Sequence, residues 1–272
     1  MARIKFTKMC AGGNDFIVID NRGSVVPPDR AVFARQVCRR KFSLGADGLL
    51  LLENSSPGND FRMRIFNPDG SEPGMCGNGA RCIARFARRR GITGERMTFE
   101  TLAGRIEAEV HDDEVRLKMS DPRDIKLHLR LRLDGDVYEV HYLNTGVPHV
   151  ILLTEAPDSL PVNELGRKIR YHKEFAPEGA NVDFVRVEGK SSLRLRTYER
   201  GVEEETLACG TGAVASAIAA FSLGKVSGPP VEVHTRGGEI LRIYFEASPS
   251  KVTNVYLEGK ARFVYEGAIL KL

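Results

Sequence analysis

A five-residue motif occurs twice in this chain and constrains its fold more than any other feature. The copies are Cys76-Gly77-Asn78-Gly79-Ala80 and Cys209-Gly210-Thr211-Gly212-Ala213, and each follows a strand-like run and opens a helix-like run. The two cysteines are 209 − 76 = 133 positions apart. At this offset, strand-like residues 16–20 fall on 149–153, residues 49–52 on 182–185, and residues 61–65 on 194–198. Such a series indicates a duplicated domain more strongly than two unrelated α/β segments of similar length.

The order of elements within each half predicts a mixed α/β fold. Strand-period runs alternate with helical patterns, and residues 98–104 fall on 231–237. The register changes only near the end, where residues 115–119 resemble 255–259 at an offset of 140. We predict two halves, residues 1–120 and 121–260. The predicted helix over residues 213–223 is apolar on every face, so we expect it to be buried.

Composition agrees with a soluble globular protein. The chain has 272 residues, 42% hydrophobic and 28% charged, with a net charge of +4. Its apolar runs are too short to span a membrane, and its first residues lack a signal peptide's apolar core. We therefore expect a cytoplasmic protein with no membrane partner. The basic cluster Arg88-Arg89-Arg90 ends a predicted helix, where cations complement the helix dipole, so we expect no nucleic-acid partner.

The five cysteines do not form a disulfide framework or a metal site. Their odd count and low density argue against structural disulfides, and their spacing is unlike that of zinc ligands. Cys38 and Cys82 lie in amphipathic helical patterns and are predicted to be core residues. The role of Cys10 stays open.

The motif itself suits acid–base chemistry on a small anion. A helix N-terminus exposes unpaired N–H groups and carries partial positive charge, and glycines let an anion approach that backbone closely. We expect the thiol pKa of a cysteine there to be lowered. Two such thiols flanking one carboxylate-bearing molecule could invert a carbon stereocentre, one removing a proton and the other delivering one. The alternative is a purely structural role, in which the glycines form tight turns and the cysteines are packed in the core. Because the motif occurs in both duplicated halves, we favour the catalytic role.

Three segments closely resemble the diaminopimelate epimerase family, and the resemblance covers essentially the full length. They are residues 66–72 (Phe-Asn-Pro-Asp-Gly-Ser-Glu), residues 75–82 around Cys76, and residues 198–212, which hold Tyr-Glu-Arg-Gly and the second motif. The resemblance implies interconversion of LL- and meso-2,6-diaminoheptanedioate, in lysine and cell-wall biosynthesis, without pyridoxal phosphate or metal. It implies two domains, each a mixed sheet around a central helix, with the active site in the cleft between them. The last strand (about 261–272) is expected to return to the first domain, and the protein is expected to be a homodimer.

The resemblance also assigns roles by position. Cys76 and Cys209 resemble the acid/base pair, and Gly77, Asn78, Gly210 and Thr211 the cradle for the carboxylate at the reacting carbon. Asn14, Asn67, Asn181 and Arg200 resemble the residues that hold the distal end of the substrate. Glu199 and His149 resemble polar residues beside the reacting centre.

The sequence departs from the family at three positions around the distal pocket. Cys10 stands where the family usually has His, Gly48 where many members have a substrate-contacting Gln, and Val147 where they have Asn before Pro-His. These departures concern the fit of the substrate more than the type of reaction.

Three rival functions stay open. The first is a proline or hydroxyproline racemase, but those enzymes typically carry His at the position of Asn78, so Asn78 argues against this function. A thiol redox protein could use Cys76 and Cys209 as a switchable disulfide, and an amino-acid-binding module would not need two thiols.

Overall fold

The structure is a computed structural model that describes residues 3–248 and 251–270. It divides into two compact units, one comprising Met1–Leu117 with Gly259–Leu272 and the other Lys118–Glu258. Within the described residues, no helix has both the length and the apolar composition needed to cross a membrane.

The first unit is a mixed sheet whose strands pair in the order β17-β1-β2-β3-β4-β5-β6-β7. Neighbours are antiparallel except for the parallel pairs β2–β3 and β4–β5, which need crossover connections. Helices α1 and α2 lie in those two connections. The bounds are β1 Ile4–Ala11, β2 Asn14–Asp20, α1 Arg30–Val37, β3 Gly48–Glu53, β4 Phe61–Phe66, α2 Gly77–Arg89, β5 Arg96–Thr101, β6 Gly104–His111, β7 Glu114–Lys118 and β17 Arg262–Ile269.

The second unit has strands that pair in the order β8-β9-β10-β11-β12-β14-β15-β16, with the short β13 beside β12. Here β10–β11 and β12–β14 are parallel, and α3 and α4 lie in their connections. The bounds are β8 Arg123–Leu133, β9 Asp136–Asn144, β10 Pro148–Leu153, η1 Pro157–Ser159, α3 Val162–Arg170, η2 Lys173–Phe175, β11 Asn181–Val187, β12 Ser192–Tyr198, β13 Glu205–Thr206, α4 Gly210–Ser222, β14 Val231–His234, β15 Ile240–Ser248 and β16 Lys251–Lys260.

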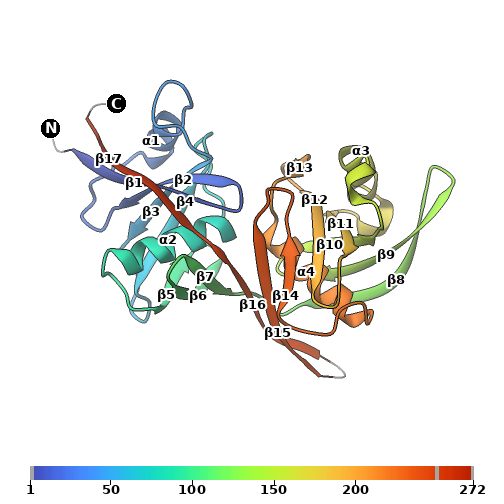
Figure 1. Ribbon diagram of the computed structural model, residues 1–272. Helices are drawn as coiled ribbons and strands as arrows, with labels where there is room; N and C mark the ends of the chain where they lie inside the picture. Colours follow the sequence, from blue (N-terminus) through green and yellow to red (C-terminus); the bar gives the residue numbers. More distant parts are fainter. Residues whose placement is uncertain (1–2, 249–250, 271–272) are drawn as a thin grey trace. The chain divides into compact units, whose positions relative to one another are not determined.

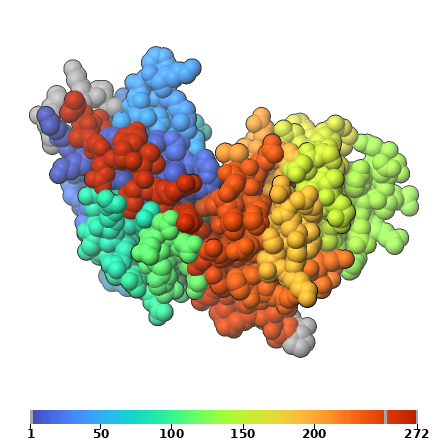
Figure 2. Space-filling view, viewed as in Figure 1, coloured from blue at the N-terminus to red at the C-terminus, as the bar shows by residue number. Residues whose placement is uncertain are grey.

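The two units share one sequence of pairings, which confirms the predicted duplication. Both run antiparallel, antiparallel, parallel, antiparallel, parallel, antiparallel, antiparallel across the sheet. The chain's last strand, β17, takes in the first unit the place that β8 takes in the second. Figure 2 shows it as red atoms against the blue N-terminal residues.

The offset of 133 is wrong by one residue in the fourth strand of the repeat. Leu51 pairs with Arg64 on β4, and its counterpart Phe184 pairs with Arg196 on β12. Because 184 − 51 = 133 while 196 − 64 = 132, the sheet aligns Arg64 with Arg196. The offset of 133 between the two halves places Arg64 on Thr197 instead.

Each sheet is covered on both faces, so its central strands are apolar throughout. In the second unit, Ile151 and Val185 pack with α4, whereas Val150 and Phe184 pack with α3. In the first unit, α2 contacts β1, β2, β3, β4 and β6 (Figure 1). The predicted buried helix is α4, in which every residue from Gly212 to Ala220 is buried.

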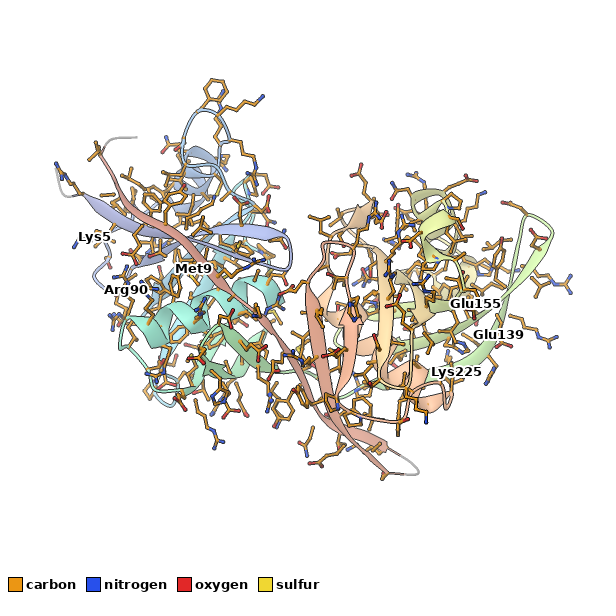
Figure 3. The ribbon with its side chains drawn as sticks, in the orientation of Figure 1. Lys5, Met9, Arg90, Glu139, Glu155 and Lys225 are labelled. Carbon is orange, nitrogen blue, oxygen red and sulfur yellow. The ribbon has the colours of Figure 1, made fainter. Side chains whose placement is uncertain are left out.

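Individual side chains follow the same division between core and surface. Met9 on β1 is fully buried, while Lys5 on the same strand is exposed (Figure 3). Cys38 and Cys82 are core residues as predicted, at 2% and 0% exposure. The basic cluster ends a helix as predicted, because α2 ends at Arg89 with Arg90 as its C-cap.

Candidate active site

The first motif places Cys76 at the N-cap of α2. Its backbone is extended, and its Sγ accepts a hydrogen bond from the backbone N–H of Gly79 at 3.5 Å. Gly77 and Asn78 are the first two residues of the helix, so their N–H groups have no intrahelical acceptor. The half-buried thiol and these N–H groups therefore lie together at the positive end of the helix dipole.

Asn78 and Asn14 form one hydrogen-bonded pair beside this helix end. Asn78 Nδ2 donates to Asn14 Oδ1 at 2.8 Å, and Asn14 Nδ2 donates to Asp47 Oδ2 at 3.4 Å. Asp47 is held in turn by the backbone N–H of Asp15 at 3.1 Å. This chain of contacts fixes which end of each amide faces the helix.

Asn67, also predicted for the site, lies in the loop that leads to Cys76. Its Nδ2 donates to Ser71 Oγ at 2.9 Å, and its backbone N–H donates to the Ser71 carbonyl at 2.9 Å. The structure thus joins Asn14 and Asn78 directly and holds Asn67 within its own turn.

The second motif places Cys209 at the N-cap of α4, with Gly210 and Thr211 opening the helix. The thiol is buried, and its Sγ lies 3.5 Å from Thr211 Oγ1. Burial raises the pKa of this thiol well above its ordinary value of 9.0, and the charges of Glu199 and Asp183 raise it further. The predicted lowering of the thiol pKa is therefore wrong for Cys209, because desolvation and two carboxylates outweigh the helix end.

Glu199 lies next to this thiol. Its Oε1 accepts a hydrogen bond from Thr206 Oγ1 at 2.6 Å. Burial raises the pKa of the carboxyl above 4.5, and hydrogen bonds from Thr206 and from the Cys209 thiol oppose the rise. The Glu199 carboxyl and the Cys209 thiol therefore lie next to each other, shielded from water, at the start of α4.

His149 on β10 is fully buried and contacts the first turn of α4. Its Nδ1 lies 2.6 Å from Asp183 Oδ2, and its Nε2 lies 2.9 Å from Thr211 Oγ1. Asp183 is also fully buried, and its Oδ1 accepts from Thr197 Oγ1 at 2.7 Å. A polar network therefore runs from β10 through β11 and β12 to the first turn of α4.

Asn181 and Arg200, both predicted to hold the distal end of the substrate, are neighbours. Asn181 Oδ1 accepts from the Arg200 backbone N–H at 2.9 Å, and its Nδ2 donates to the Pro148 carbonyl at 3.2 Å. The Arg200 guanidinium lies 3.9 Å from the carboxylate of Glu178, whose side chain is 78% exposed. Such an exposed contact leaves the guanidinium able to exchange partners.

Both cysteines are preceded by a matching ion pair. Arg64 on β4 binds Glu72 through Nε–Oε1 and Nη2–Oε2, both at 2.7 Å. Arg196 on β12 binds Glu205 through the same atoms at the same distances. Each glutamate stands four residues before its cysteine, since 76 − 72 and 209 − 205 are both 4. The repeated bidentate pair anchors the segment that delivers the thiol.

One of the three departures, Gly48, has a structural explanation. A β-carbon on Gly48 would lie 3.2 Å from Cδ1 of Phe16 and from the Phe66 carbonyl, so this position is closely packed. The Val147 carbonyl accepts the backbone N–H of Thr145 at 3.1 Å. Cys10 is half-buried on β1, opposite Asp15.

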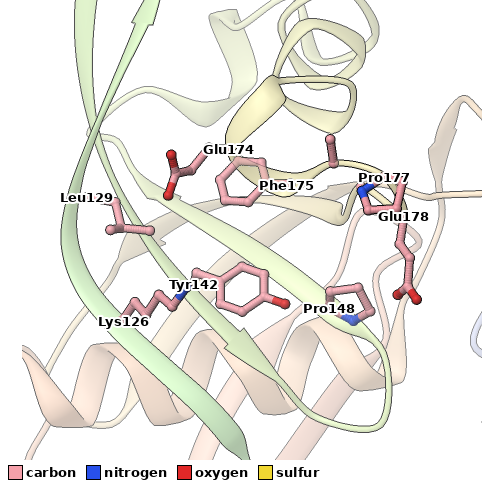
Figure 4. Close-up of a pocket in the computed structure, with 10 residues that line it drawn as sticks. Lys126, Leu129, Tyr142, Pro148, Glu174, Phe175, Pro177 and Glu178 are labelled. Atoms are coloured by element: carbon pink, nitrogen blue, oxygen red, sulfur yellow. The ribbon is translucent and has the colours of Figure 1, made fainter.

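A hollow of about 210 Å³ lies elsewhere on the second unit (Figure 4). Tyr142 and Phe175 form its aromatic wall with parallel rings 5.8 Å apart, and Lys126 and Glu178 lie at its edge. None of the residues predicted for the site lines it. Within residues 3–248 and 251–270, there is also no group of three His, Cys, Asp or Glu side chains that could hold a metal ion.

Sequence reasoning missed Asp183 and Asp47. Asp183 carried a usable signal, because an acidic residue interrupts the otherwise apolar run of residues 182–185. Asp47 stood in a turn, where an aspartate is ordinary. Its contact with Asn14 depends on strands β2 and β3 lying side by side.

Comparison with solved structures defines the class of fold. A phenazine biosynthesis protein of the PhzF family from Bacillus anthracis matches with a TM-score of 0.72 and 19% identity, covering 100% of both chains. A hydroxyproline epimerase from Agrobacterium vitis, with bound trans-4-hydroxy-L-proline, matches with a TM-score of 0.64 and 16% identity over 98% of this chain and 92% of that one. The chain has the two-unit fold of these proteins.

The sequence comparison is more specific. Residues 6–125 and 141–264 match the family described as diaminopimelate epimerase. The diaminopimelate epimerase of Aquifex aeolicus is 44% identical over 98% of each chain, and that of Chlorobaculum tepidum is 44% identical over 96% of this chain and 99% of its own. The diaminopimelate epimerase of Archaeoglobus fulgidus is 43% identical over 99% of this chain and 97% of its own. This chain belongs to the diaminopimelate epimerase family.

Proposed function

We propose that this protein is an isomerase that interconverts LL- and meso-2,6-diaminoheptanedioate. Family membership over nearly the whole chain carries the proposal. The positions of Cys76 and Cys209 support it, because each is the N-cap of the helix that its motif opens. The reaction needs a proton removed from and returned to one α-carbon, which two thiols can do without pyridoxal phosphate or metal.

The two thiols act as a base and an acid on opposite faces of the substrate. The thiolate of one cysteine takes the α-proton, and the thiol of the other gives a proton to the same carbon, so the configuration inverts. The N–H groups at Gly77, Asn78, Gly210 and Thr211 stabilise the negative charge that develops on the adjacent carboxylate. Each cysteine ends the turnover in the protonation state in which the other began.

The remaining predicted residues select the substrate. Arg200 binds the distal carboxylate, for which a guanidinium is geometrically suited. The side chains of Asn14, Asn67 and Asn181 hold the distal amino-acid group. Glu199 faces the ammonium group at the reacting carbon, and His149 lies beside it.

The product belongs to lysine and peptidoglycan precursor synthesis, so we place the enzyme in the cytoplasm. We expect a homodimer, as the resemblance to the family implies. Light scattering at several concentrations tests the oligomeric state. A monomer at every concentration would exclude the dimer and leave the reaction untouched.

Proton NMR of the protein with LL-diaminoheptanedioate in deuterium oxide tests the reaction directly. Without added cofactor, the α-proton signal should disappear as the meso isomer forms. Cys76→Ala and Cys209→Ala should each slow epimerisation by about 10²–10⁴-fold or more, the usual contribution of a positioned acid or base.

Other outcomes point to the rival functions. If diaminoheptanedioate is inert and proline exchanges, the reaction class stands and the substrate is wrong. If no amino acid exchanges under reducing conditions, a redox or binding role is favoured. A Cys76–Cys209 disulfide found by mass spectrometry after mild oxidation would support the redox role.

A further inference from the structure

The loop that carries Arg200 has a constrained backbone. It connects β12 to β13 and spans residues 199–204. The backbone N–H of Glu203 donates to the Glu199 carbonyl at 2.8 Å, which closes the loop into a tight turn. Within this turn, Gly201 has a φ of +92° and Glu203 a φ of +62°. A left-handed backbone is costly for a residue with a side chain, and such residues concentrate at functional sites.

The Glu203 side chain holds this turn from within. Its Oε1 accepts a hydrogen bond from the backbone N–H of Gly201 at 3.0 Å, and its Oε2 accepts one from the Tyr198 hydroxyl at 3.2 Å. The carboxylate therefore connects the residue that precedes Glu199 to the residue that follows Arg200. These two residues between them are the ones that the proposed site uses.

Arg170 holds the same carboxylate from outside the loop. It is the last residue of α3, and its Nε and Nη2 both lie 3.3 Å from Glu203 Oε1. Partial burial opposes ionisation of Glu203, but the Gly201 N–H and the Arg170 charge keep the pKa of its carboxyl below the ordinary 4.5. The Arg170 side chain is only 12% exposed. The ion pair is therefore less screened by water than a pair on the surface.

The Arg170 guanidinium also contacts a second loop of the site. Its Nη1 donates to the carbonyl of Glu178 at 2.9 Å, and a β-carbon on Gly179 would collide with it. Glu178 belongs to the segment between η2 and β11, which leads directly to Asn181 (Figure 4). Asn181 Oδ1 in turn accepts the backbone N–H of Arg200 at 2.9 Å. One guanidinium thus connects the two segments that carry Asn181 and Arg200.

The first unit shows that the fold does not require an arginine at the end of this helix. Its helix α1 ends at Val37, which is fully buried and corresponds to Arg170, since 170 − 37 = 133. The loop after β4 holds itself, because the Ser71 backbone N–H donates to Asp69 Oδ1 at 2.8 Å. That loop has no arginine among residues 67–72. The arginine at the helix end therefore occurs in the unit whose loop carries Arg200.

We infer that Arg170 and Glu203 are positioning residues that hold Arg200 in place to bind the distal carboxylate of the substrate. The inference rests on the proposed epimerase function. The contact of Arg200 with the exposed carboxylate of Glu178, at 3.9 Å, is too long to fix the guanidinium. Its position depends instead on the backbone of its loop, which Arg170 and Glu203 hold. A guanidinium aligned before the substrate arrives loses less conformational freedom on binding, so the affinity rises.

Steady-state kinetics with LL-diaminoheptanedioate test the positioning role. Arg170→Met should raise KM and lower kcat/KM by up to about 10²-fold, the effect expected when a binding group is displaced by about 1 Å. The change in kcat should be smaller, because Glu199 on the same loop is held separately by Thr206. The matched control is Lys168→Met on the same helix, which breaks two surface ion pairs of 2.7 and 2.8 Å and should leave KM unchanged.

A double-mutant cycle distinguishes positioning from a general structural role. If Arg170 acts through the Arg200 guanidinium, Arg170→Met should have little further effect on kcat/KM in an Arg200→Met background. A loss by the same factor in both backgrounds would overturn the inference. Glu203→Gln keeps an oxygen that can accept the Gly201 N–H, whereas Glu203→Ala removes it. Glu203→Gln should therefore retain more of kcat/KM than Glu203→Ala.

Amide hydrogen exchange measured by NMR tests the contacts of the loop without requiring activity. In the wild type, the backbone N–H groups of Arg200 and Gly201 should be protected, because both have side-chain acceptors. Arg170→Met and Glu203→Ala should reduce the protection of Gly201, while Phe184 in the centre of β11 keeps its rate. An unprotected Gly201 N–H in the wild type would overturn the inference whatever the activity of the enzyme.

The outcomes separate the positioning role from the reaction. An active wild type whose Arg170→Met and Glu203→Ala variants keep full kcat/KM would overturn the positioning role alone. A wild type that exchanges no amino acid, although its Gly201 N–H is protected, would overturn the proposed function and the inference with it. If Arg170→Met does not fold, the comparison of Glu203→Gln with Glu203→Ala still decides.

Discussion

A β-carbon on Gly12 would lie 2.5 Å from Oδ1 of Asn78. Gly12 has a φ of +58°, in the region that side chains rarely adopt. Two independent reasons therefore keep this position a glycine, and one of them acts through a residue proposed to cradle the substrate carboxylate.

Gly12→Ala should weaken substrate binding as well as stability. The methyl group must displace the Asn78 side chain and break its 2.8 Å bond to Asn14, so KM should rise. The left-handed backbone adds about 1–2 kcal/mol of destabilisation. Gly91→Ala is the matched control, because Gly91 has a φ of +65° and nothing within 4 Å of the added carbon. It should lose stability and keep its KM; equal KM values in the two variants would contradict the prediction.

Glu199→Gln should stabilise the protein at neutral pH while lowering its activity. Burial raises the pKa of Glu199 above 4.5, so between 4.5 and the raised value the native state keeps a proton that the unfolded chain has lost. Stability then falls as pH rises through this window, and a glutamine has no such loss. The melting temperature of the variant relative to wild type should increase from pH 4.5 to pH 8. A difference that shrinks as pH rises would contradict the assignment.

The two arginine pairs should differ in their contribution to stability. The side chains of Arg196 and Glu205 are 9% and 17% exposed, against 21% and 23% for Arg64 and Glu72. Removing one partner of a buried pair costs about 3–5 kcal/mol, so Arg196→Met should unfold at a lower urea concentration than Arg64→Met. The exposed Arg96–Glu109 pair provides the control, and Arg96→Met should cost less than about 1 kcal/mol. Equal losses of stability in all three variants would show that the burial of an ion pair does not determine its contribution to stability.

Much of the fold could be predicted because the chain repeats itself. The offset of 133 located the paired strands and both central helices. This was possible because the two halves share the order and spacing of their elements, although few of their residues are identical. The one-residue error at Arg64 arose because a single offset was applied to every strand. The alternation itself carried the correct register, since at an offset of 132 residues 61–64 fall on 193–196, apolar on apolar and basic on basic.

The site could be predicted in its parts but not in its electrostatics. The motif located both helix ends, and general chemistry suggested a lowered thiol pKa at each. For Cys209 the outcome depends on Glu199 and Asp183, which lie ten and twenty-six residues earlier in the chain. Desolvation and nearby charge are properties of the folded unit, so the sign of the shift required the structure.

Alkylation of the native protein should report these environments cysteine by cysteine. The thiolate is the reactive form, so half-buried Cys10 and Cys76 should react with iodoacetamide before buried Cys209. Cys38 should react late, because burial raises its pKa to about 12. Peptide mass spectrometry over time gives the order, and the unfolded protein, in which all five should react alike, is the reference.

The same measurement isolates the effect of one charge on Cys209. Glu199→Gln removes a carboxylate that raises the Cys209 pKa, so a larger fraction of this thiol is ionised at a given pH. Cys209 should then be alkylated faster than in the wild type while Cys76 keeps its rate. Glu204→Gln changes an exposed carboxylate of the same loop and should leave both rates unchanged. If Cys209 reacts no faster in Glu199→Gln, the repulsion between this carboxylate and the thiolate does not control the thiol.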